Sequence, residues 1–236
     1  MASDERPVSV QGGGYDHKDT SYFAMARDDY VDALPDNAEA SILEIGCSNG
    51  ATGALALARG KCRRYCGVEL FPEPAAAASE RLTEVVEGDV EQVELPWPAE
   101  SFDALILSEV LEHLRDPWAV LGRLRPLLRP GALVFASTPN VAHREIIVML
   151  LKGRWELQSY GPLDATHLRW FSPSSLRRAF EEAGFVVDSV GPLGALGPGS
   201  AIVDRVLRGR LRHLWHRQID LRAHVPHAPD SRVVGT

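Results

Sequence analysis

The fold expected for this chain is decided by twelve consecutive residues, Ile42-Leu43-Glu44-Ile45-Gly46-Cys47-Ser48-Asn49-Gly50-Ala51-Thr52-Gly53. The apolar run 41–45 predicts a buried strand that stops at a glycine-rich turn, and residues 54–58 predict the helix that follows. In such a unit, main-chain N–H groups and the helix N-terminus face the polar end of a ligand. Glycine suits the turn because it adopts unusual φ/ψ values and has no Cβ to block a ligand. Many nucleotide-binding folds share this pattern, so by itself it indicates only a nucleotide-like ligand.

Composition narrows the class of protein. At 236 residues, with 45% hydrophobic and 24% charged residues, the chain has the profile of a soluble globular protein. Its net charge of −7 does not indicate the excess of basic residues that is typical of nucleic-acid-binding proteins. Cys47, Cys62 and Cys66 show neither a disulfide framework nor metal-site spacing. Residues 1–6 lack an apolar signal region and no apolar run approaches the ~18 residues of a membrane span, so we expect a cytoplasmic protein without a transmembrane segment.

Strand and helix patterns alternate along residues 15–225, which we expect to form one domain between an N-terminal tail at 1–14 and a C-terminal tail at 226–236. This alternation predicts an α/β fold whose mostly parallel sheet is covered by helices on both faces. The alternation of strands and helices is interrupted at residues 138–171, which form an irregular insertion. We expect strands at 41–45, 65–70, 85–86, 102–107, 132–136, 185–190 and near 218–221, and helices at 20–34, 54–60, 75–82, 117–128, 145–152 and 173–183. We expect Pro130-Gly131 to form a turn before the fifth strand.

Polar residues stand where these strands end, which is the edge of a parallel sheet that binds ligands. Glu69, 23 residues after Gly46, ends the second strand at the distance typical of an acid that binds a ribose diol. Asp89 follows the third strand and could accept from an exocyclic amine, although a Gly-Asp turn is the structural alternative. Ser108 and Glu109 end the fourth strand. Glu44 is an acid within a buried strand, which is costly unless the acid is paired or meets a cation.

These residues carry a resemblance to the class I S-adenosylmethionine-dependent methyltransferases. The similar stretches are 43–50, 67–70, 88–89, 102–104 and 107–117, within a likeness that covers about residues 15–190. The resemblance implies a Rossmann-like, seven-stranded, mostly parallel sheet with an antiparallel last strand, and S-adenosyl-L-methionine as cofactor. The family usually has glycine where this chain has Ser48, and serine is small enough that we expect binding to survive. The implied cofactor-binding residues are Arg27, Glu44, Gly46, Cys47, Ser48, Asn49, Gly50, Glu69, Leu70, Asp89, Val90, Ser108 and Glu109.

A narrower resemblance lies in the insertion. Residues 137–143, 151–155 and 161–172 resemble methyltransferases of bacterial polysaccharide and natural-product gene clusters and, more distantly, ubiquinone-pathway O-methyltransferases. The insertion follows the fourth and fifth strands, where an acceptor would face the methyl donor. We therefore expect O-methylation of a hydroxyl on a sugar or natural product, with a small molecule or glycan as the acceptor.

A hydroxyl acceptor must lose its proton as it attacks, and histidine is the usual base. His167 is the first candidate because it lies in the polar run 164–167, where Asp164 could orient its ring. His143 is the second candidate and His113 the third. A structural hydrogen bond that pins the insertion to the sheet is the competing interpretation of His167.

Two further patterns leave alternatives open. Glu109, Glu112 and His113 would share one face if helical and could bind a divalent metal, or their acids could simply complement a helix start. The arginine-rich stretch 204–222 could bind a phosphate-bearing acceptor or an anionic membrane surface, but it could also be a solvated helix face.

The rival functions are N-methylation of a small-molecule amine, a nicotinamide-dependent oxidoreductase and a non-catalytic S-adenosylmethionine-binding protein. The oxidoreductase fits poorly because residues 46–51 depart from its glycine fingerprint. A homodimer is compatible with the sequence.

Overall fold

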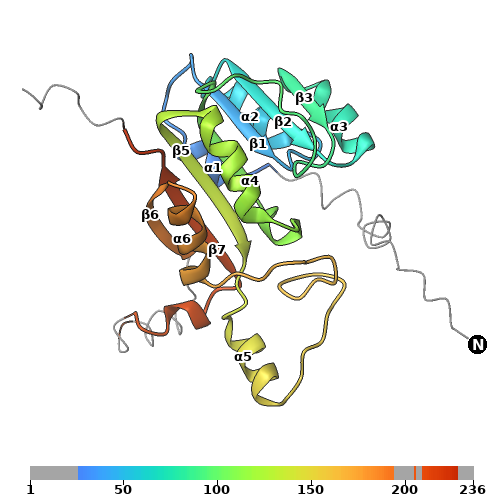
Figure 1. The fold of residues 1–236 in the computed structure, drawn as a ribbon, viewed down its shortest axis with the longest axis vertical. Coiled ribbons are helices and arrows are strands. Elements are labelled where there is room, and N and C mark those ends of the chain that lie inside the picture. The colour runs from blue at the N-terminus through green and yellow to red at the C-terminus, as the bar shows by residue number, and fades with distance from the viewer. Residues whose placement is uncertain (1–25, 194–204, 206–208, 228–236) are drawn as a thin grey trace, which may run out of the picture.

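The computed structural model describes residues 26–193, 205 and 209–227, and these residues contain a seven-stranded sheet (Figure 1). The strand order is β3-β2-β1-β4-β5-β7-β6. Strands β1 to β5 pair in parallel, and β7 runs antiparallel to both β5 and β6. The predicted α/β class, the mostly parallel sheet and the antiparallel last strand are confirmed. The strands are β1 (Ser41–Ile45), β2 (Arg64–Glu69), β3 (Glu84–Glu87), β4 (Phe102–Ser108), β5 (Leu128–Pro139), β6 (Val186–Pro192) and β7 (Gln218–His224).

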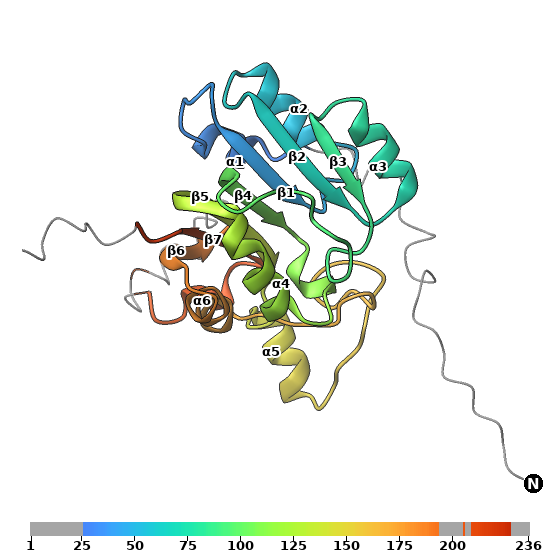
Figure 2. The same cartoon turned by 45° about the horizontal axis from the view of Figure 1, so that its top comes forward.

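Helices cover both faces of this sheet (Figure 2). They are α1 (Asp28–Ala33), α2 (Ala51–Ala58), α3 (Pro72–Ser79), α4 (Pro117–Leu124), α5 (Arg144–Leu151) and α6 (Pro173–Glu182), with short 3-10 helices η2 (Leu111–His113), η3 (Arg125–Leu127) and η4 (Arg212–Leu214). Successive strand residues point to opposite faces, so β1 serves two cores. Leu43 and Ile45 pack with α4 and α6, whereas Ile42 packs with α1, α2 and α3. The expected N-terminal tail at 1–14 lies outside the described residues, as does the expected C-terminal tail beyond 227.

The first helix differs from its predicted range. A helix was expected at 20–34, but α1 begins at Asp28, and residues 20–25 lie outside the described part of the chain. Arg27 precedes the helix with φ −85° and ψ 75°, because its backbone N–H donates to Thr52 Oγ1 and its side chain is held by Asp29. The local apolar pattern could not anticipate these contacts.

Two boundaries around β5 also differ from the prediction. The helix expected to reach 128 ends at Leu124, because Pro126 lacks an N–H and turns the chain into η3. The Pro130-Gly131 turn is instead an irregularity inside β5, which starts at Leu128 rather than 132. The register with β4 shifts there, and Gly131 has a φ of 82°. A Pro-Gly pair in a strand is therefore absorbed as a bulge.

The turn after β1 lies against β2 because residue 67 is a glycine. A Cβ placed on Gly67 would lie 2.8 Å from the Cβ of Cys47, which is closer than real side chains approach. The buried Cys47 side chain fills that space. The absence of a side chain in β2 thus fixes how closely the glycine-rich turn packs on the sheet.

We predict that Gly67→Ala lowers the free energy of unfolding by about 1–3 kcal/mol, since it overpacks this contact. The matched control is Gly122→Ala in α4, where an added Cβ meets nothing within 4 Å. That control should instead gain up to about 1 kcal/mol from helix propensity. Urea titration of both variants measures the difference, and equal stabilities would contradict the packing argument.

Candidate active site

The glycine-rich turn has three residues with left-handed backbone conformations. Gly46, Ser48 and Gly50 have φ values of 69°, 50° and 78°. At Gly46 the space is also closed, because a Cβ there would lie 2.6 Å from Val110 Cγ2. Ser48 adopts the same region with a side chain, and its N–H donates to Glu69. Glycine at positions 46 and 50 is thus required by geometry, whereas serine at 48 is tolerated at some strain.

Glu69 stands at the end of β2, directly beside this turn. Its Oε2 accepts from the Ser48 N–H at 2.8 Å and its Oε1 from the Phe71 N–H at 3.0 Å. The side chain is buried, and this burial raises the pKa of its carboxyl group. The next residue, Leu70, is 51% exposed although it is apolar. Asn49 Oδ1 accepts from the Ala51 N–H at 3.1 Å in the turn that leads into α2.

Asp89 follows β3 and holds a turn. Its Oδ1 accepts from the Glu91 N–H at 2.9 Å, and its Oδ2 accepts from Arg115 Nη2 at 2.8 Å. The structural alternative considered for Asp89 is therefore present, and it leaves the carboxylate partly exposed. The side chain of Val90 is buried in the core, so only its backbone could face a ligand.

Glu44 and Cys47 turn their side chains into the protein. Glu44 Oε2 accepts from the Tyr65 hydroxyl at 2.8 Å, and burial raises the pKa of this carboxyl group from 4.5 to about 8. Burial also raises the pKa of the Cys47 thiol. Near neutral pH, Glu44 therefore holds a proton unless a cation approaches it.

Arg27 connects α1 with the ends of β4 and β5. Its Nη1 donates to Ser108 Oγ and, at 3.0 Å, to Ser137 Oγ. Asp29 accepts from the other side of the guanidinium at 2.9 and 2.8 Å, and the Tyr30 ring lies 3.7 Å from Arg27 Cζ. The guanidinium thus lies at the strand ends that the sequence singled out, held in place by its neighbours.

Glu109 points away from Glu112 and His113. Its φ is 54°, and η2 begins only at Leu111, so residues 109–113 are not one helix. Glu109 Oε2 accepts from Gln218 Nε2 of β7 at 3.0 Å, and burial raises the pKa of its carboxyl group. The metal set considered from sequence, Glu109 with Glu112 and His113, is therefore not assembled.

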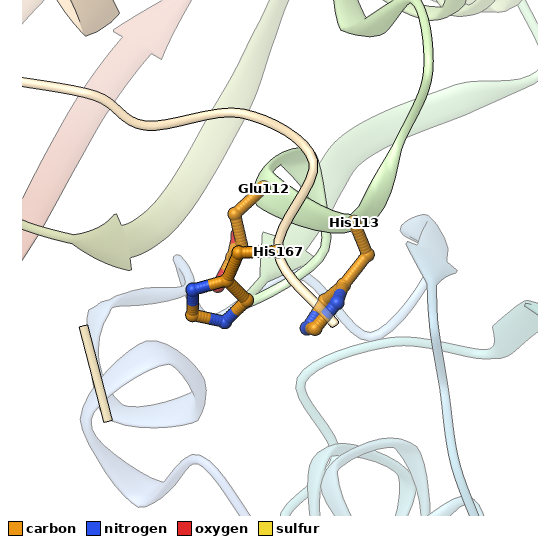
Figure 3. A group of neighbouring side chains, drawn as sticks. All are labelled: Glu112, His113 and His167. Carbon is orange, nitrogen blue, oxygen red and sulfur yellow. The ribbon is translucent and has the colours of Figure 1, made fainter. Parts of the chain in front are cut away.

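His167 takes the place of Glu109 in that cluster (Figure 3). Glu112, His113 and His167 each offer one ligand atom, and these atoms lie within 4.8 Å of one another. The two imidazole rings meet edge to face with centroids 4.8 Å apart. The insertion reaches this point because the Leu168 and Arg169 N–H groups donate to the Glu112 carbonyl at 2.8 and 3.0 Å.

Backbone carbonyls orient both rings of the cluster. His113 Nδ1 lies 3.3 Å from the Thr166 carbonyl oxygen, and His167 Nδ1 lies 3.3 Å from the Pro162 carbonyl oxygen. A carbonyl oxygen only accepts, so a neutral ring that keeps this contact holds its proton on Nδ1 and its lone pair on Nε2. This is the state in which imidazole accepts a proton or binds a divalent cation, with the carbonyl fixing the tautomer.

Asp164 and His143 also have clear local positions. Asp164 Oδ1 accepts from the Thr166 N–H at 2.9 Å and from its hydroxyl at 2.7 Å, and the Asp164 carbonyl accepts from the His167 N–H at 3.0 Å. Asp164 thus shapes the turn that carries His167. His143 caps α5, where its Nδ1 accepts from the Glu145 N–H at 3.4 Å, and burial lowers its pKa.

The comparison with protein families agrees with this geometry. A family model described as a methyltransferase domain matches residues 15–190, which is most of the chain. The chain belongs to this family. It is a class I, S-adenosylmethionine-dependent methyltransferase, and the resemblance of the sequence to that class is confirmed.

Other methyltransferases are similar along most of this chain. A ubiquinone biosynthesis O-methyltransferase of Aeromonas salmonicida is 29% identical over 151 residues, which are 62% of this chain and 63% of that protein. An S-adenosylmethionine-dependent methyltransferase from Archaeoglobus fulgidus superposes with a TM-score of 0.62 at 18% identity, over 86% of this chain and 96% of that one. An S-adenosylmethionine-dependent methyltransferase from Mesorhizobium loti superposes with a TM-score of 0.59 at 18% identity, over 83% of this chain and 96% of that one. At these identities the solved structures show the fold alone.

We predict that Glu69→Gln weakens binding of S-adenosylhomocysteine at least about tenfold, because one charged acceptor at the end of β2 is lost. The matched control is Glu73→Gln in α3, an exposed acid a few residues away that should bind as the wild type does. Isothermal titration calorimetry measures both. Unchanged affinity of Glu69→Gln would exclude a direct contact with the cofactor.

We predict a distinct pH signature for Glu44. The pKa of its carboxyl group is about 8 in the folded protein against 4.5 as its ordinary value, so the folded state holds the proton more tightly. This contribution to stability is full below the unfolded pKa and is lost as pH rises through the folded pKa, at about 1.4 kcal/mol per pH unit. Relative to the wild type, Glu44→Gln should therefore gain stability between about pH 5 and pH 8. Parallel curves of unfolding free energy against pH would contradict this.

Proposed function

We propose that this methyltransferase transfers the methyl group of S-adenosylmethionine to a hydroxyl group of a sugar or natural-product acceptor in the cytoplasm. The observation that carries the proposal is the pair His113 and His167, whose Nδ1 atoms face backbone carbonyls and whose Nε2 atoms therefore carry the lone pairs. A hydroxyl acceptor needs such a group, because its proton must leave as the oxygen attacks. The similarity to an enzyme named as an O-methyltransferase supports the same choice.

The cofactor residues proposed from sequence fit the geometry of the strand ends. Gly46 lets the turn pack against Val110 in a left-handed conformation, and Glu69 has its carboxylate at the adjacent strand end. When bound, S-adenosylmethionine supplies a methyl group on a sulfonium centre. We propose that Glu69 contacts the ribose and that Leu70, Asp89 and Val90 contact the adenine. The backbone of the turn contacts the methionine portion, through Gly46, Cys47, Ser48, Asn49 and Gly50. Glu44 would meet the ammonium group of the methionine portion and Arg27 its carboxylate, while Ser108 and Glu109 would lie beside the methyl group.

Within this scheme the protein supplies alignment, exclusion of water and removal of one proton. His167 Nε2 accepts the proton of the acceptor hydroxyl, while its Nδ1–H stays on the Pro162 carbonyl. Glu112 lies within the same cluster and stabilises the imidazolium by its negative charge. Asp164 positions His167 through the turn that it closes.

A specific observation also favours a second use of the cluster. One ligand atom each from Glu112, His113 and His167 lies within 4.8 Å of the others, and a carboxylate with two imidazoles suits a divalent cation. Glu112, His113 and His167 would hold such a cation, which would supply Lewis-acid activation of the acceptor hydroxyl. Both uses serve methylation of a hydroxyl and differ only in what activates it.

We predict that His167→Ala lowers kcat at least about a hundredfold with a phenolic or sugar hydroxyl acceptor, since a positioned base contributes on that scale. His143→Ala is the matched control, because His143 caps α5 and should cost less than about tenfold. Calorimetry with S-adenosylhomocysteine verifies that both variants still bind the cofactor. A loss below about tenfold for His167→Ala would favour N-methylation of an amine, which needs little help from a base.

The same methyl-transfer assay distinguishes His167 acting as a base from a metal ion bound by the cluster. Activity that survives dialysis against a chelator assigns His167 the role of base, whereas activity lost and then restored by Mg²⁺, Mn²⁺ or Zn²⁺ assigns the cluster a cation. A protein that binds S-adenosylhomocysteine tightly but methylates neither hydroxyl nor amine acceptors from its own gene neighbourhood would be the non-catalytic alternative.

A further inference from the structure

The insertion carries an uncovered apolar surface. Thirteen large apolar side chains are exposed among the described residues, and nine of them lie between 147 and 170. Leu151 is 82% exposed and Tyr160 is 75% exposed. We call these nine residues the insertion surface: Ile147, Val148, Leu150, Leu151, Trp155, Leu157, Tyr160, Leu168 and Trp170. A monomer in water rarely leaves so many such residues together.

Helix α5 is the centre of this surface. Residues 146–151 are all apolar, yet only Ile146 is buried. Figures 1 and 2 both show α5 projecting away from the sheet, so the described elements do not shelter its outer face. A helix that is apolar on several sides normally lies inside a protein or against a membrane. The described residues therefore leave most of the apolar side chains of α5 uncovered.

Aromatic residues flank the helix. Trp155 and Trp170 pack edge to face with ring centroids 5.5 Å apart, and Tyr160 lies in the same segment. Tryptophan and tyrosine gather at membrane–water interfaces, because one part of each ring system is apolar and another forms hydrogen bonds with headgroups or water. This composition distinguishes the insertion surface from an ordinary apolar patch.

Basic residues surround the same corner of the molecule, although the chain has a net charge of −7. The stretches 144–156 and 209–217 contain six basic side chains, Arg144, Lys152, Arg154, Arg210, Arg212 and Arg217, against two acids, Glu145 and Glu156. Both acids are engaged, Glu145 by Arg217 at 2.7 Å and Glu156 by Arg154 at 2.6 Å. Arg144 lies over the Trp215 ring. Trp215 and Arg217 of the arginine-rich stretch thus contact α5, while residues 204 and 206–208 of that stretch lie outside the description.

We propose that the insertion surface binds a bilayer that contains anionic lipids, with α5 lying in the headgroup region. Apolar side chains enter the interface, and the basic side chains around them attract anionic headgroups. A second copy of the chain is a poorer occupant, because a twofold contact would bring the same basic border against itself. No described helix has the length and apolar character to cross a membrane, so the contact is peripheral.

The position of the surface matters for catalysis if the proposed function holds. Leu168 follows His167 directly, Trp170 lies three residues after it, and the Leu168 N–H donates to the Glu112 carbonyl. The histidine cluster therefore lies beside the face that meets the bilayer. An acceptor anchored by a lipid chain would reach it without leaving the membrane, whereas vesicle binding itself does not depend on the acceptor.

Sedimentation of the full chain with vesicles tests the proposal. We expect at least about tenfold stronger partitioning onto phosphatidylcholine vesicles with about 30% phosphatidylglycerol than onto phosphatidylcholine alone. This binding should weaken several-fold between about 0.05 and 0.3 M salt. The double variant Leu150→Ser/Leu151→Ser should lose at least about tenfold, because two exposed apolar side chains no longer enter the interface. The matched control, Val186→Ser, changes an exposed apolar residue on β6 and should bind as the wild type does.

Two results would overturn the proposal. One is equal vesicle binding by the wild type and the Leu150→Ser/Leu151→Ser variant. The other is a dimer in light scattering that the double variant converts to a monomer, which would assign the surface to a second copy of the chain. Calorimetry with S-adenosylhomocysteine verifies that the double variant is folded, so a failure of vesicle binding is distinct from a failure of methyl transfer.

Discussion

The hydrogen bond from the Ser48 N–H to the Glu69 carboxylate is the contact on which the geometry of the proposed cofactor site depends. It joins the turn after β1 to the end of β2, two strands that lie side by side in parallel. The turn can come this close because Gly67 has no side chain and Cys47 fills the space. A ligand that binds at the turn is therefore presented to a carboxylate at a fixed distance, before any ligand arrives.

Buried acids are a second constraint of the same region. Burial raises the pKa of the carboxyl groups of Glu44, Glu69 and Glu109, and each lies at or next to the end of a strand. Such groups are expensive in a protein interior and gather where a ligand offsets their cost. A cofactor with an ammonium group and a sulfonium centre carries positive charge of the kind that these acids would stabilise. In the proposed site, the cost of burying these acids would therefore be lower when the cofactor is bound.

The loop after β4 couples the two halves of the site. The Glu112 carbonyl accepts from Leu168 and Arg169 and so fixes the end of the insertion. Arg115 in the same loop reaches Asp89 after β3. One short segment therefore contacts both the proposed adenine end and the end of the insertion that carries His167. Because the insertion also carries the uncovered apolar surface, the same loop lies between the cofactor and the proposed membrane contact.

The sequence by itself determined the architecture, since the period of apolar residues specifies strands and helices and a parallel sheet brings the ends of β1, β2, β3 and β4 to one edge. It also predicted the glycine-rich turn after β1 and an acid at the end of β2, and the structure brings the two together. Boundaries were less certain, as α1 and Pro130-Gly131 show, because contacts with distant residues shift them. Only the tertiary structure decided that His167, and not Glu109, joins Glu112 and His113. That choice depends on the left-handed backbone conformation of Glu109 and on hydrogen bonds between residues 56 and 57 positions apart, which no local pattern encodes.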